Sequence, residues 1–211
     1  MAAGWWYANR AAGLVAWALL SASMVVGLLL SSKALGKRPR ANWLTDLHRG
    51  LSGLAVAFVG VHVAAAIGDS YVHFGATEIL VPFTSSWRPL AIAWGVVSMY
   101  LLIAVEASSL MRKRLSKAVW RKIHFLSFPL FVTATVHGVT AGSELGTTAG
   151  IAAAALATAA ITTLTALRIM DEVAKAKQPP PPPRVPPLVV PTGPPQMPTE
   201  PPTRVPVGSS F

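Results

Sequence analysis

Long apolar stretches, separated by short charged segments, run through most of this sequence. A stretch of about 18 or more apolar residues can cross a hydrocarbon core about 30 Å thick as a helix. Five stretches meet this length, at about residues 11–32, 43–67, 89–111, 120–141 and, with smaller and less apolar side chains, 149–167. The sequence therefore predicts an all-α integral membrane protein, a bundle of about five transmembrane helices.

The composition agrees with this class and excludes several kinds of site. Only 12% of the 211 residues are charged, against about a quarter in soluble domains. The absence of cysteine excludes disulfides, thiolate zinc sites, iron–sulfur clusters and c-type haem attachment. The net charge of +10 comes from residues placed where helices would leave the membrane, so we expect contact with the lipid bilayer and no nucleic-acid partner.

The basic residues also predict an orientation. They follow the first span (33–40), the third span (112–122) and the fifth span (168–177), whereas the loops after the second and fourth spans carry almost none. Lys and Arg are enriched in cytoplasmic loops. We expect a multi-pass protein of the cell membrane with its N-terminus outside and its C-terminus in the cytoplasm.

Three segments follow from this topology: residues 1–10 as a short extracytoplasmic N-terminus, 11–168 as the helical bundle and 169–211 as a cytoplasmic tail. From Gln178 onward the tail is dominated by proline. Proline fixes φ and removes backbone donors, so the tail is predicted to be disordered or polyproline II. A solvated tail is the simpler interpretation, and a PxxP-type ligand is the alternative.

Four of the five histidines lie inside predicted spans: His48 and His62 in the second, His124 and His137 in the fourth. Ionisable residues within a membrane are costly and indicate functional sites. His62 follows His48 by 14 residues, and His137 follows His124 by 13, a rise of about 20 Å in each helix.

Tryptophans place the two lower histidines at a similar depth. His48 lies five residues after Trp43 and His124 lies four after Trp120, and tryptophan anchors helices at the membrane interface. Neighbouring helices would then present one histidine pair low and one high, which suits two stacked bis-histidine haems. The alternative is that these histidines only hydrogen-bond helices together. Small residues nearby (Gly50, Gly53, Gly60, Ala64–Ala66 and Gly138) would admit a macrocycle or serve close helix packing.

The phase of the fourth span opposes a simple version of this interpretation. At 100° per residue, 14 residues return to within about 40° of the same face, but 13 residues miss it by about 140°. Pro129 lies between His124 and His137 and could kink the helix.

Other ionisable residues have less specific interpretations. His73 falls in an outer loop and is expected at the surface. Glu106 would either bond a haem propionate or extend towards Arg112, and we favour the second. Arg49 and Arg121 flank the lower histidines, where they would pair with haem propionates or with lipid phosphates.

The segments HRGLSGLAVAFVGVH and RKRLSKAVWRKIHFLSFPLFVTATVH, with VPFTSSWRPL between them, resemble the ferric reductase-like transmembrane family. That family includes the haem subunit of the periplasmic methionine sulfoxide reductase system and the haem core of NADPH oxidases. The resemblance covers roughly residues 11–168. It implies an inner haem b held by His48 and His124, and an outer haem b held by His62 and His137.

The chain departs from the family pattern in two ways. Many members have six spans, and the flavin and nicotinamide domains of the oxidases have no counterpart here, since no GxGxxG fingerprint is present. Flavin would thus enter only through a partner. The resemblance implies the membrane subunit of an oxidoreductase, which exchanges electrons with a separate reductase, flavoprotein or quinol and with an acceptor on either side. The alternative is a non-redox scaffold or transporter accessory protein.

Overall fold

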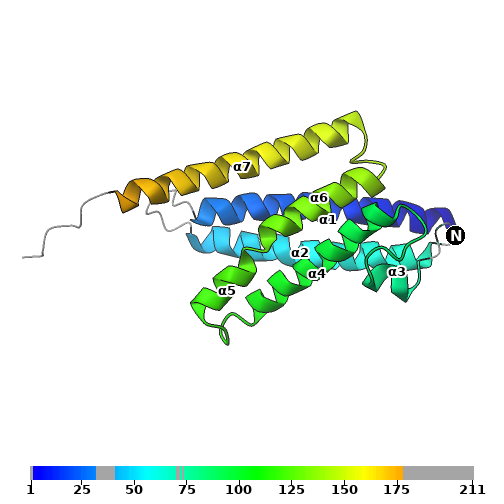
Figure 1. Cartoon of the computed structure of the whole chain (residues 1–211), viewed down its shortest axis with the longest axis horizontal. Coiled ribbons are helices and arrows are strands. Elements are labelled where there is room, and N and C mark those ends of the chain that lie inside the picture. The colour runs from blue at the N-terminus through cyan, green and yellow to red at the C-terminus, as the bar shows by residue number, and fades with distance from the viewer. Residues whose placement is uncertain (1, 32–40, 70–71, 73, 178–211) are drawn as a thin grey trace, which may run out of the picture. The chain divides into compact units, whose positions relative to one another are not determined.

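The computed structural model describes residues 2–31, 41–69, 72 and 74–177. The first basic loop, His73 and the tail from residue 178 lie outside the described residues. Helices account for nearly all of the rest, in the order α1 (Ala2–Ser31), α2 (Ala41–Gly68), α3 (Ala76–Leu80), α4 (Pro89–Leu110), α5 (Lys117–His124), α6 (Ser127–Ala141) and α7 (Thr148–Ala176) (Figure 1).

Within the described part, five helical stretches are long and apolar enough to cross a membrane, with α5 and α6 counted together as one. This confirms the predicted all-α membrane fold. Two helices are longer than predicted: α1 begins at Ala2, and α7 continues beyond Leu167 to Ala176. Large apolar side chains remain exposed on the spanning helices, for example Leu110 of α4 (85%) and Leu156 of α7 (73%), as expected for surfaces that face lipid rather than water.

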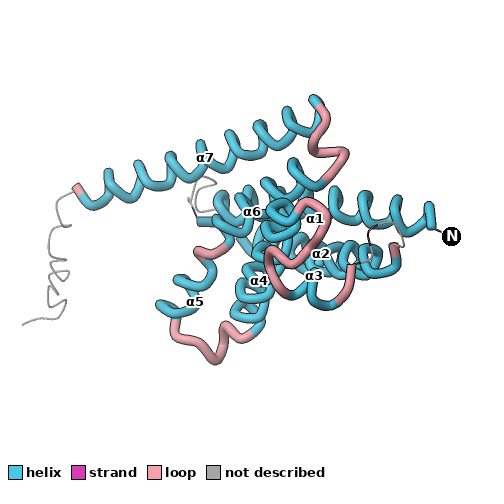
Figure 2. The backbone as a smooth tube through the Cα atoms, turned by 45° about the vertical axis from the view of Figure 1, so that its right-hand side comes forward, coloured by secondary structure: helices cyan, strands magenta, loops and turns pink. Residues whose placement is uncertain are grey.

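Helix packing divides the bundle into two close pairs. Helix α1 lies along α2, and α4 packs against α6, while α1 also contacts α6 and α7 (Figures 1 and 2). A core of Met24, Leu28, Phe131 and Ile161 joins α1, α6 and α7. Helix α1 therefore makes most of the contacts between the two pairs, and α2 contacts α4 less extensively.

The fourth span is broken at Phe125 and Leu126, between α5 and α6. The break lies one turn before Pro129, because a proline ring lacks the N–H and clashes with the carbonyl four residues earlier. The chain tightens there: the Leu126 amide donates to the Ile123 carbonyl (2.9 Å) and the Phe128 amide to the Phe125 carbonyl (3.2 Å). Helix α6 therefore need not continue the phase of α5.

Candidate functional site

The structure brings the four membrane histidines together in two pairs. The rings of His48 (α2) and His124 (α5) have centres 6.1 Å apart and planes at 77°. The rings of His62 (α2) and His137 (α6) have centres 6.2 Å apart and planes at 73°. The helix break places His124 and His137 beside the same helix, although a straight helix would turn them to different faces.

Backbone carbonyls orient both rings of the His62–His137 pair. This pair is named the outer pair after the predicted topology, and the His48–His124 pair is named the inner pair. His62 Nδ1 lies 2.9 Å from the Asn9 carbonyl oxygen in α1, and His137 Nδ1 lies 2.8 Å from the Ala91 carbonyl oxygen in α4. A carbonyl only accepts, so in each ring Nδ1 carries the hydrogen and donates it. The Nε2 lone pair then remains free for a metal, which is the usual arrangement of a metal-binding histidine.

The two rings of the inner pair have different surroundings. His48 Nδ1 lies 2.9 Å from the Ser23 carbonyl oxygen and 3.0 Å from Ser23 Oγ, which also contacts Ser52 Oγ at 2.9 Å. His124 Nδ1 is buried and has no hydrogen-bond partner among the described residues. Its ring instead stacks on Trp120, with centres 4.9 Å apart. Stacking, rather than a carbonyl, therefore orients this fourth ring.

Three glycines on neighbouring helices leave space for the other three rings. A Cβ atom on Gly13 would lie 2.9 Å from His62 Nδ1, one on Gly27 would lie 3.1 Å from His48 Cε1, and one on Gly95 would lie 2.7 Å from His137 Cε1. Any larger side chain at Gly13 or Gly95 would displace the ring or part the helices. None of these three glycines is marked by a sequence motif. A Cβ on Gly50, Gly53 or Gly60, which were predicted to admit a macrocycle or serve close helix packing, would meet nothing within 4 Å.

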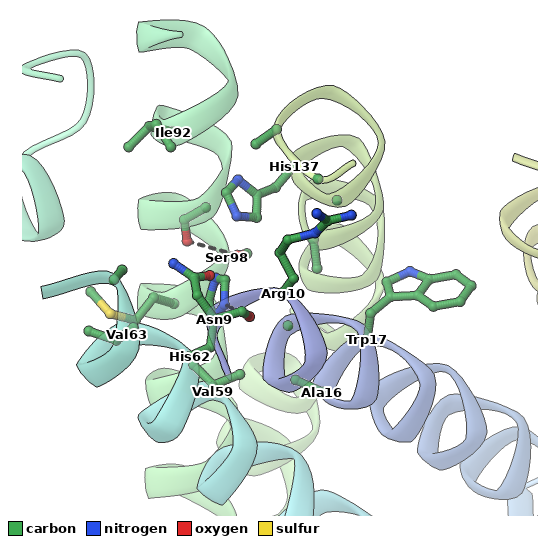
Figure 3. Close-up of a pocket in the computed structure, with 18 of the residues that line it drawn as sticks. Asn9, Arg10, Ala16, Trp17, Val59, His62, Val63, Ile92, Ser98 and His137 are labelled. Carbon is green, nitrogen blue, oxygen red and sulfur yellow. Dashed lines mark hydrogen bonds between the residues drawn. The ribbon is translucent and has the colours of Figure 1, made fainter. Parts of the chain in front are cut away.

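A cavity of about 430 Å³ surrounds the outer pair (Figure 3). This volume is in the range of small-molecule and cofactor sites, about 300–1,000 Å³. Its walls are mainly apolar, and Asn9, Arg10, Arg88 and Glu144 add polar groups. Arg10 forms an ion pair with Glu144 and lies over the Trp6 ring, 3.9 Å from its centre.

Each pair suits one metal ion held between two imidazoles. Two rings that share a metal at about 2 Å from each Nε2 have centres about 6 Å apart. In the described part of the chain, no group of three or more His, Cys, Asp or Glu residues could hold a metal ion. A porphyrin, which supplies four equatorial nitrogens, would need only two such imidazoles from the protein.

Glu106 lies closer to the inner histidine pair than its predicted contact with Arg112 implies. It forms no ion pair with Arg112 within the described residues, and its side chain faces Ser52 and His48 instead. Arg112 lies over the Trp120 ring, 4.6 Å from its centre. Arg49 and Arg121 are exposed, so both interpretations of these arginines, as partners of propionate or of lipid phosphate, stay open.

The family model of the ferric reductase like transmembrane component matches residues 12–135. The match covers more than half of the chain, including His48, His62 and His124, and ends two residues before His137. Neither the curated proteins nor the solved structures include a match to this chain. The family match, over four of the five spans, shows that the chain belongs to the ferric reductase-like transmembrane family.

Proposed function

We propose that this protein carries electrons across the membrane through two b-type haems, as the membrane subunit of an oxidoreductase. His48 and His124 would hold the inner haem, and His62 and His137 the outer haem. The observation that carries the proposal is the repeated geometry of the two pairs, whose ring centres lie 6.1 and 6.2 Å apart. The two pairs have nearly the same ring separation, and their α2 members lie 14 residues apart, so each pair would hold one haem along the path of the electron.

The residues around the outer pair fit an apolar, planar group with axial histidine ligands. The outer pair lies in a cavity lined mainly by apolar side chains, and neutral imidazoles avoid burying charge in the membrane. When bound, haem supplies a one-electron couple whose potential depends on ligands, burial and hydrogen bonds. The chain's own residues would hold three of the imidazoles at Nδ1 and the fourth, His124, by stacking on Trp120, and apolar walls around the outer pair would exclude water.

The electron donor is proposed to be a separate protein or a quinol. The sequence carries no GxGxxG fingerprint, so hydride from NAD(P)H would reach this subunit only through a partner reductase or flavoprotein. The acceptor would be a protein or ferric ion in contact with one end of the bundle. Membership of the family supports transmembrane electron transfer, and these partners complete that proposal.

An absorption spectrum of the purified protein tests the proposal. We expect a Soret band, sharp α-bands on reduction, and about two haems per chain by pyridine haemochrome, because two histidine pairs are present. A non-redox scaffold whose histidines only join helices would be colourless. A colourless protein from haem-supplemented cells would therefore refute the proposed function.

A second prediction concerns orientation. We expect the loop at Lys113 to be cytoplasmic and the N-terminus to be outside, because Arg112, Lys113 and Arg114 are exposed and basic. Single cysteines placed at Lys113 and at Ser143 would report this through labelling of intact cells, since the native chain has no cysteine. The impermeant reagent should label position 143 alone, and labelling of position 113 alone would reverse the topology.

A further inference from the structure

Arg88 adopts an unusual backbone conformation at the start of α4. Its φ of 43° and ψ of 61° lie in the left-handed region, which non-glycine residues occupy at a cost and often at functional sites. The following Pro89 occupies the first turn of α4, and the right-handed helical region is disfavoured for a residue before proline. Contacts made by the Arg88 side chain must offset the cost of this conformation.

Those contacts lead to the last turn of α6. Arg88 NH1 donates to the Thr140 carbonyl oxygen at 2.7 Å, one of the terminal carbonyls that a helix leaves without an internal partner. A cation at a helix C-terminus is also favoured by the helix dipole. The guanidinium carbon lies 5.0 Å from the centre of the Trp87 ring, which limits where the side chain can point.

A second hydrogen bond runs between the same two turns in the opposite direction. His137, one turn before Thr140 in α6, donates from Nδ1 to the Ala91 carbonyl of α4 at 2.8 Å. Gly95, the next turn of α4, lies directly against the His137 ring. The α4 start and the α6 end are thus joined by one bond through Arg88 and one through His137 itself.

We propose that Arg88 is a positioning residue for the outer haem: by bonding the end of α6 to the start of α4, it sets the orientation of the His137 ring. The inference rests on the proposed function, because it concerns a histidine that would bind iron. Without the Arg88 bond, the end of α6 loses one of the two hydrogen bonds described above that join it to the start of α4. The His137 ring could then rotate, and the angle between the His62 and His137 ring planes would depart from 73°.

Electron paramagnetic resonance of the oxidised protein reads this angle directly. In low-spin ferric haem with two imidazole ligands, the largest g value rises as the ring planes approach the perpendicular, because the ligand field then splits the iron d orbitals least. We expect Arg88→Ala to shift the g-maximum of the outer haem, or broaden it, and to leave the inner signal unchanged. The two signals are assigned beforehand from the His62→Ala variant.

Arg10→Ala is the matched control. Arg10 also lines the outer cavity and carries the same charge, but it pairs with the Glu144 side chain rather than with a helix carbonyl. Loss of charge alone would affect both variants similarly, whereas loss of positioning would move only the Arg88→Ala signal. Arg88→Lys, which keeps the charge and one donor, should show a smaller shift and serves if Arg88→Ala fails to insert.

The outcomes separate this inference from the proposed function. Absence of haem from the unmodified protein would refute the proposed function. Two normal haems in Arg88→Ala with an unmoved outer signal would refute the positioning role alone. An equal shift in Arg88→Ala and Arg10→Ala would refute it as well, because charge would then explain the change.

Discussion

Replacing His137 by alanine is expected to remove one of the two haems and to leave the other in place. The ring centres of His137 and His62 lie 6.2 Å apart, and the inner rings form a separate pair at 6.1 Å, so under the proposed function each pair would hold one iron. His62→Ala should empty the same outer site. Haem per chain, measured as pyridine haemochrome, should fall by about half in either variant and no further in the double variant.

The inner pair supplies the reciprocal test. His48→Ala and His124→Ala should each empty the inner site and retain the outer haem, and all four variants should stop electron transfer across the membrane. His73→Ala, outside the predicted spans, should keep both haems. The two-site proposal would be wrong if His48→Ala and His62→Ala together removed only one haem.

The second large effect is expected from Gly95→Val. A Cβ at this position would lie 2.7 Å from His137 Cε1 and 2.8 Å from Nδ1, well inside van der Waals contact. The ring is also held by its bond to Ala91, so it cannot swing away without losing that bond. We expect most of the outer haem to be lost and the inner haem to remain, as measured by haemochrome content and by the two paramagnetic signals.

Gly60→Val is the control for this substitution. It makes the same change in an apolar helix, but a Cβ at Gly60 would meet nothing within 4 Å. Haem content should therefore match that of the unmodified protein. Equal haem loss in both variants would show that valine disturbs helix insertion in general and that Gly95 has no special place beside His137.

The five spans could be predicted from sequence because a membrane imposes one simple rule. Every backbone group in the lipid must be paired within its own segment, so apolar length alone identifies the helices. The four histidines within these spans could be identified as well, because an ionisable side chain inside a membrane is costly. The third span begins at residue 89 as predicted, and Pro89 lies in its first turn, where proline is tolerated.

The surroundings of the histidines could not be predicted, because they depend on contacts between helices. Asn9 and Ala91 take part through backbone carbonyls, which every residue possesses and no motif marks. A histidine ring from another helix lies against each of Gly13, Gly27 and Gly95. Gly60 also stands in an apolar stretch of sequence, but no side chain lies within 4 Å of a Cβ placed there. Pro129 indicated a kink, but the size and direction of the turn between α5 and α6 depend on packing against α4 and α1.

The break at Phe125 and Leu126 also changes which insertions and deletions the fourth span can tolerate. In α2, one added residue between His48 and His62 would rotate one histidine by about 100° relative to the other, so that helix permits only whole-turn changes. Between His124 and His137 the two helical segments are joined at Phe125 and Leu126, where hydrogen bonds three residues apart replace those four residues apart, and a length change at this joint would be absorbed by repacking there. Related chains should therefore vary in histidine spacing in the fourth span at the joint before Pro129, while the spacing in the second span stays constant.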